Sequence, residues 1–276
     1  MNDARRADAV LGFYGPDSMM WRINREAVLL GAGPAALLLQ VAHPLIAEGV
    51  AHHSTFESDP WRRLHGTIRT TMNLVFGNAV NAERAVKRLN SVHAGVRGPN
   101  YRAMDPQLLL WVQATLIVTS VFAYQRWVGQ LSANEIEQFW QEARAVGTRL
   151  GIPLSASPAD WPALERYWEK MLAEDGPVHV TPTARRLARL IVRPPFRFVP
   201  GPLVDLAALP GLALVPPRLR AEFGISWSPA KDRLAGMVSQ GVRAWTAVVP
   251  RTLRSMPQAI AADRRVAAPR YNSRTP

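Results

Sequence analysis

The sequence predicts an all-α protein built as a single large helical domain. Apolar residues recur three or four positions apart in four long segments, 82–96, 106–128, 132–151 and 157–174, and this is the spacing of one face of an α-helix. No segment shows the sustained alternation of a half-buried strand, although 191–199 (IVRPPFRFV) is ambiguous. The chain has 276 residues, 48% of them hydrophobic, which is enough to bury a sizeable core.

Capping residues support the boundaries of two of these helices. Ser132 can cap a helix N-terminus together with Glu135 three residues later, and Gly151 can end the same helix. Ser157 or Asp160 can cap the next one. We therefore expect one helix within 132–151 and another within 157–174, the second capped by either residue.

Residues 28–39 (VLLGAGPAALLL) look like the glycine-rich turn of a dinucleotide-binding protein. That fingerprint needs a preceding strand, a following helix and a second strand that ends in an acidic residue. The following stretch, 40–60, offers no clean second strand. We therefore expect Gly31, Gly33 and Pro34 to bend or start a buried helix that approaches another element closely.

The amino-acid composition changes at about residue 176, and prolines are frequent from there to Pro217. Proline interrupts helices, so we interpret 176–217 as a proline-rich segment that wraps the molecule. It would join a helical core at 10–175 to a C-terminal helical portion at 218–262. The tail, 263–276, is expected to be disordered.

Composition excludes several kinds of site. The chain has no cysteine, which rules out disulfides, Cys-ligated zinc, iron–sulfur clusters and thiolate-bound haem. Lys and Arg number 33 against 21 acidic residues, a net charge of +12, but no nucleic-acid motif accompanies the arginines and no nucleic acid is expected as a partner. The basic C-terminal segments indicate either a solvated face or a membrane-surface contact.

Two apolar stretches, 27–51 and 108–124, raise the question of a membrane span. The first contains glycine, proline, histidine and glutamate, and the second is slightly short for a bilayer. We therefore expect buried core helices. The N-terminus carries no apolar signal region, so the expected location is the cytoplasm, with peripheral membrane contact left open.

His93 is the most informative of the six histidines. On the predicted helix over 82–96 it shares a face with Ala82, Val86, Leu89 and Val96. A core histidine that is satisfied by a backbone carbonyl is one explanation for such a position. The alternative is a metal ligand, because no acid lies on this face and a neutral imidazole nitrogen can bind a metal.

A second group of polar residues lies in 59–77 (DPWRRLHGTIRTTMNLVFG). If this segment is helical, Arg63 and Thr67 lie on one side, together with Thr70 or Thr71. The pair would place a fixed cation and a hydroxyl in one groove.

A metal site made only of protein side chains is a weaker possibility. Its donors would be His52, His53, Glu48, Glu57 and Asp59. Their spacing matches no standard zinc or di-iron pattern.

Several stretches, taken in order, resemble a known family. They are AHPLIAEGV at 42–50, HHSTFESDPWRRLHGT at 52–67, VHAGVRG at 92–98, YRAMDPQLLLWVQATL at 101–116 and LGIP at 150–153. In this order and spacing they resemble the family that includes rubber oxygenases and the membrane-associated oxygenase of mycophenolic acid biosynthesis. The likeness covers residues 10–175 and is weaker at 215–227.

The resemblance implies a helical fold with a globin-like core and additional helices, and a non-covalently bound haem b. It further implies that His93 is the axial ligand of the haem iron and that Arg63 and Thr67 lie on the distal side. Two positions depart from the family pattern. Gly66 stands where some rubber-cleaving relatives carry Lys, and Gln113 stands where many relatives have His.

These observations lead to one principal hypothesis, a haem b-dependent oxygenase that uses O2 on an apolar small molecule. Unsaturated and isoprenoid-like compounds are the candidate substrates, and an electron donor would be a further partner. One alternative is a haem carrier or sensor without catalysis. The other is a haem-free helical protein at a membrane surface.

Overall fold

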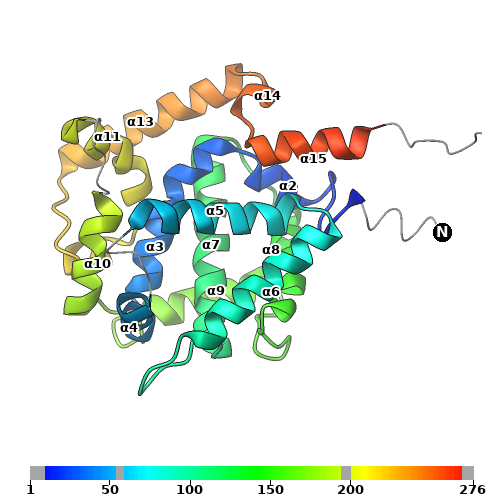
Figure 1. Ribbon diagram of the computed structural model, residues 1–276. Coiled ribbons are helices and arrows are strands. Elements are labelled where there is room, and N and C mark those ends of the chain that lie inside the picture. The colour runs from blue at the N-terminus through cyan, green and yellow to red at the C-terminus, as the bar shows by residue number, and fades with distance from the viewer. Residues whose placement is uncertain (1–9, 54–58, 194–199, 269–276) are drawn as a thin grey trace, which may run out of the picture.

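The computed structural model describes residues 10–53, 59–193 and 200–268, and in these ranges all regular structure is helical (Figure 1). The prediction of an all-α domain is confirmed, because only isolated bridges occur here in place of strands. The elements in chain order are α2 (Met19–Asn24), η1 (Ala27–Ala32), α3 (Gly33–Val41), α4 (Pro44–His53), α5 (Pro60–Phe76), α6 (Ala79–Gly95), α7 (Pro106–Trp127), α8 (Ala133–Arg149), α9 (Trp161–Leu172), α10 (Pro182–Val192), α11 (Gly201–Leu212), α12 (Pro217–Glu222), α13 (Pro229–Val248), α14 (Arg251–Arg254) and α15 (Pro257–Ala267).

The long helix α7 occupies the centre of the molecule (Figure 1). Asp105 caps its first turn by accepting from the Gln107 N–H, and Trp111 is fully buried with its indole N–H donated to the Leu39 carbonyl at 3.1 Å. Within the described ranges α7 is the one unbroken helix long and apolar enough to cross a bilayer, but 67% of its most apolar window is buried in protein. Helices α3 and α4 pass the same test only as a pair bent by 106°. The burial of α7 is what a core helix shows.

The two larger clusters of buried hydrophobic side chains both include residues of α7. The first joins α2, α5, α6 and α8 to α7 around Trp21, Phe76 and Trp140. The second joins α3, α10 and α12 around Leu38, Leu187 and Leu219, with Trp111 contributed by α7. One helix thus supports both halves of the fold.

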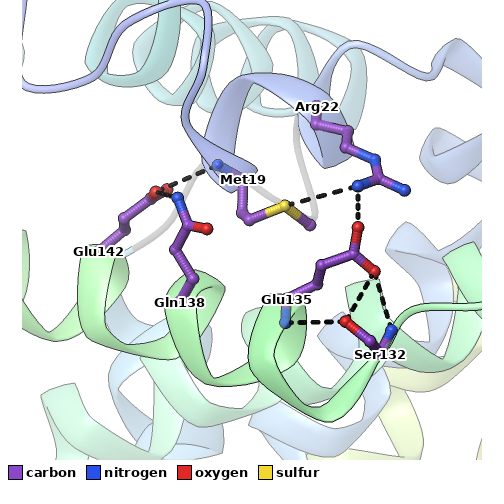
Figure 2. Close-up of polar contacts among 6 residues, drawn as sticks. All are labelled: Met19, Arg22, Ser132, Glu135, Gln138 and Glu142. Atoms are coloured by element: carbon purple, nitrogen blue, oxygen red, sulfur yellow. Dashed lines mark hydrogen bonds and ion pairs between the residues drawn. The ribbon is translucent and has the colours of Figure 1, made fainter.

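The contact between α2 and α8 shows how the predicted capping residues work (Figure 2). Ser132 and Glu135 form a reciprocal capping box at the start of α8, as predicted. Glu135 also pairs with Arg22 of α2. Two turns further along α8, the Glu142 carboxylate accepts the backbone N–H groups of Met19 at 3.1 Å and Met20 at 2.8 Å. The first turn of α2 is therefore held by an anion from another helix, where the helix dipole favours one.

The glycine-rich segment is not a nucleotide-binding turn. Residues 27–32 form the 3-10 helix η1, and α3 begins at Gly33 with Pro34 in its first turn. A side chain at Gly211 of α11 would overlap the Gly31 carbonyl oxygen, and the Trp127 ring lies 3.6 Å from where a Gly31 Cβ would be. The glycines start a buried helix at a close approach between elements, as predicted.

The proline-rich segment folds into helices of its own. Prolines stand in the first turns of α10, α11 and α12, where a missing N–H costs nothing. Helix α10 packs on α3 and α4 and buries Leu187 completely. The ambiguous stretch 191–199 lies largely outside the described residues. At the other end, α15 extends to Ala267, so the first residues of the tail expected to be disordered are helical, while 269–276 are outside the described part of the chain.

Candidate functional site

Helices α5 and α6 form a V that carries the predicted site residues. They are joined at Gly77 and Asn78, and they diverge from that junction toward the start of α5 and the end of α6 (Figure 1). The junction is tight, because a Cβ at Gly77 would overlap the Asn73 carbonyl oxygen. Asn78 then caps α6 by accepting the Asn81 N–H at 3.0 Å. Gly77 and Asn78 therefore fix the position at which α5 and α6 meet.

Burial falls along both arms of the V. Near the junction, Leu74, Val75 and Phe76 of α5 and Ala82, Ala85 and Val86 of α6 are buried. Near the open ends, Leu64 of α5 is 38% exposed and Val92 of α6 is 51% exposed. The described part of the protein thus leaves apolar side chains partly uncovered where the two helices separate.

His93 lies in the last turn of α6, on the open part of the V. Its helix face is buried at Ala82 and Val86 and becomes half-buried at Leu89 and His93. The His93 carbonyl accepts the Val96 N–H at 3.1 Å, which ends the helix. The imidazole is therefore half-buried at the end of the predicted inward face.

Thr67 lies on the other arm, and its side chain is exposed. Arg63 is one turn earlier in α5, and its side chain lies outside what the structure describes. Between them, a Cβ at Gly66, the position at which some relatives carry Lys, would meet no atom of the described residues within 4 Å.

A turn that follows α6 holds the C-terminal end of this helix, which carries His93. The Gly98 N–H donates to the Tyr101 carbonyl at 2.9 Å, and Tyr101 packs so closely on Gly98 that a Cβ there would collide with its ring. His53 at the end of α4 lies 2.9 Å from the Arg97 carbonyl oxygen, and His52 lies 3.3 Å from the Tyr101 hydroxyl. His52 and His53 therefore connect the end of α4 to the turn after α6.

Tyr101 was not singled out from the sequence as a structural residue. The signal that could have found it is the glycine three residues earlier, since tight turns favour glycine where another side chain approaches the backbone.

His43 is the most buried histidine among the described residues, at the corner between α3 and α4. Burial lowers the pKa of its imidazole, the nearby His179 lowers it further, and Asp105 opposes the shift. Its Nδ1 has no hydrogen-bond partner among the described residues. A neutral imidazole at this corner is the second candidate for a metal ligand.

A metal site made only of protein side chains is not found in the described ranges, where no three His, Asp or Glu side chains cluster. Glu57 of the proposed set lies outside those ranges. Glu48 and His52 do lie together, 3.7 Å apart.

Gln113 connects helices α7 and α8. Its Nε2 donates to the Ala143 carbonyl of α8 at 2.8 Å. The side chain is therefore engaged between α7 and α8.

Comparison with known proteins identifies relatives for most of the chain. Residues 20–251 match the family model described as "ER-bound oxygenase mpaB/B'/Rubber oxygenase, catalytic domain". The uncharacterized proteins Mb2261 of Mycobacterium bovis and Rv2237 of Mycobacterium tuberculosis are each 30% identical over 214 residues, which is 72% of this chain and 82% of each relative. No solved structure matches the chain, and the globin-like arrangement of the core stays a prediction.

Proposed function

Because the chain belongs to the ER-bound oxygenase mpaB and rubber oxygenase catalytic-domain family, we propose that it is a haem b-dependent oxygenase acting on an apolar small molecule. The observation that carries this proposal is the placement of Thr67 on α5 and His93 on α6, two helices that meet at Gly77 and Asn78 and diverge from there. Membership of the family supports the oxygenase class. The haem, its ligand and the substrate class are our proposal.

The residues of the V fit a porphyrin. Leu64 and Val92 present partly uncovered apolar side chains near its open ends, which suits a flat apolar ring. A Cβ at Gly66 or at Gly95 would meet no atom of the described residues within 4 Å.

His93 would hold the iron. A half-buried imidazole at the end of a helix can coordinate through a neutral nitrogen. When bound, haem supplies an iron centre that activates O2 for oxidation of an unsaturated carbon chain. Among the other histidines, His52 and His53 contact the turn after α6, and His43 and His65 are the alternative ligands.

Thr67 and Arg63 would bind and orient dioxygen. A hydroxyl and a guanidinium donate hydrogen bonds, and the donors are most effective when they are fixed before the reaction. Asp59 caps α5 by accepting the Arg62 N–H at 3.0 Å, and the capped helix holds the backbone of both residues. The apolar side chains near the open ends would help to exclude water.

The haem propionates would pair with arginines near the site. Arg22 is committed to Glu135 on α8, and the Arg97 Nε donates to the Ala94 carbonyl at 2.8 Å. Arg62 and Arg69 are exposed on α5 itself. These two are therefore the favoured partners.

Oxygen consumption tests the proposal against the alternative of a haem carrier or sensor. Purified protein would be loaded with hemin, reduced, and supplied with isoprenoid alkenes under air. An oxygenase forms oxygenated products and consumes O2 in proportion to them. A carrier or sensor takes up haem with the same ligand and forms no product, and that result would reject the catalytic assignment.

A further inference from the structure

Helix α13 buries small and polar residues against α7, while some of its larger apolar residues stay exposed. Its fully buried positions are Ala235, Ser239 and Thr246. The Trp127 indole N–H donates to the Ser239 hydroxyl at 3.3 Å, and the Thr246 hydroxyl donates to the Trp127 carbonyl at 2.6 Å. Small and polar residues thus make the contact between α13 and α7.

The opposite side of α13 is apolar and exposed. Met237 is 60% exposed, Trp245 is 44% exposed and Val248 is 79% exposed. With Gly241 they recur at intervals of three or four residues, which places them along one stripe of the helix. Leu253 on α14, 76% exposed, follows in the chain. Helix α13 lies along the outer edge of the molecule and leads directly into α14 (Figure 1), so this stripe faces away from the protein body.

Basic residues outnumber acidic ones around the stripe. From 233 to 262 the sequence contains Arg233, Arg243, Arg251 and Arg254 and no acidic residue, and of these Arg254 pairs with Glu26 from an earlier part of the chain. Amphipathic segments that combine apolar side chains, tryptophan and arginine bind the interface of anionic bilayers.

A basic pocket opens beside the stripe. It has a volume of about 410 Å³ and is lined by Arg25, Arg251, Arg264 and Asp263, among others. Arg25 is buried and bonds Asp263 at 2.6 Å, but its Nε has no hydrogen-bond partner among the described residues. Burial and the neighbouring Arg25 lower the pKa of Arg251. Glu26 and Asp263 oppose this shift, and a bound anion would offset the remaining repulsion among these guanidiniums.

We propose that the outward stripe of α13 and α14 docks on an anionic phospholipid bilayer. Met237, Trp245, Val248 and Leu253 would enter the interface between headgroups and acyl chains. The pocket of Arg25, Arg251 and Arg264 would receive a lipid phosphate. This proposal is independent of haem, and it would bring an enzyme for apolar substrates to the phase in which such substrates dissolve.

Vesicle sedimentation tests the docking surface. The full chain would be mixed with phosphatidylcholine vesicles and with vesicles of phosphatidylcholine and phosphatidylglycerol in roughly a 2:1 ratio. We expect binding to the anionic vesicles that weakens as salt is raised. Val248→Glu combined with Leu253→Glu should weaken that binding by about tenfold or more, because both introduced carboxylates would enter the apolar interface.

Two further variants keep the test specific. Leu154→Glu changes a side chain that is 52% exposed between α8 and α9, so it introduces the same chemistry elsewhere and should leave binding unchanged. Arg251→Gln should reduce binding to anionic vesicles only. Thermal unfolding of each variant confirms that it is folded.

Three outcomes would overturn the proposal. One is the absence of sedimentation with anionic vesicles. Another is equal binding by the double variant and by Leu154→Glu. The third is a lipid-free dimer of the native protein that Val248→Glu dissociates, which would assign the stripe to a second copy of the chain.

Discussion

Gln113 of α7 fits against Gly147 of α8 so closely that a Cβ on Gly147 would lie 2.8 Å from the Gln113 Nε2. The same nitrogen donates to the Ala143 carbonyl at 2.8 Å. One side chain therefore fixes the crossing of two core helices. A position at which many relatives have His is occupied in this chain by a packing contact.

Gly147→Ala should destabilise the protein. The added methyl group would push the Gln113 amide from its bond to Ala143, and overpacking of this kind costs about 1–3 kcal/mol. The free energy of unfolding in urea measures the effect. Gly236→Ala is the matched control, because a Cβ at that position of α13 would meet no atom within 4 Å, and alanine in a helix should there be neutral or stabilising by up to about 1 kcal/mol. An equal decrease in the free energy of unfolding in Gly147→Ala and Gly236→Ala would contradict the role given to Gln113.

Glu135 should make stability depend on acidic pH. The backbone N–H of Ser132, and next Arg22, lower the pKa of the Glu135 carboxyl below its ordinary value. A lowered pKa in the folded state contributes stability that is present above the unfolded value of 4.5 and is lost as the pH falls through the folded value. Glu135→Gln should remove that part of the acid dependence. Urea midpoints at pH 7 and at lower pH measure it, and an unchanged dependence would argue against the charged capping box.

His43 should add a second pH dependence, at higher pH. Burial, and then His179, lower the pKa of His43 from its ordinary 6.5, so the unfolded chain binds the proton more tightly than the folded one. Stability should therefore decline as the pH falls below about 6.5. In His43→Gln the decline between pH 7 and pH 5.5 should be smaller. An identical decline in the variant would mean that other groups control stability in this range.

Thr67 and Arg63 should matter for turnover more than for cofactor binding. Thr67→Val keeps the shape and removes the hydroxyl donor, so turnover should fall by about 100-fold while haem content is retained. Arg63→Ala should also keep haem and impair reaction with oxygen. Thr70→Val is a control, because the Thr70 hydroxyl already donates to the Gly66 carbonyl within α5 at 2.8 Å. Loss of haem in Thr67→Val would place the residue in cofactor binding and contradict the proposed role.

Local patterns were sufficient to predict much of the fold. Segments 82–96, 106–128, 132–151 and 157–174 form α6 to α9 because their apolar spacing and caps act within one or two helical turns. The capping box of Ser132 and Glu135 is such a local feature, and so is Asp160, which caps α9 by accepting the Ala163 N–H.

The features that could not be predicted from the sequence depend on contacts between residues far apart in the chain. Ser239 and Thr246 of α13 are buried because both bond to Trp127 of α7, which lies more than a hundred residues away in the chain. Prolines of the 176–217 segment stand in the first turns of α10, α11 and α12. The packing of α10 on α3 and α4 is a contact that the local sequence did not indicate. The face of His93 could be predicted from helical spacing, but the separation of α5 and α6 around it depends on the tertiary structure.

Haem stoichiometry in a His93 variant tests the central claim most directly. Protein produced with adequate iron would be assayed for its Soret band and for haem per chain, together with His93→Ala and with His65→Ala as a control on the other arm of the V. We expect haem in the native protein and in His65→Ala, a loss of about tenfold or more in His93→Ala, and recovery when imidazole is added. Full haem occupancy in His93→Ala would contradict it, and so would a native protein that takes up no hemin.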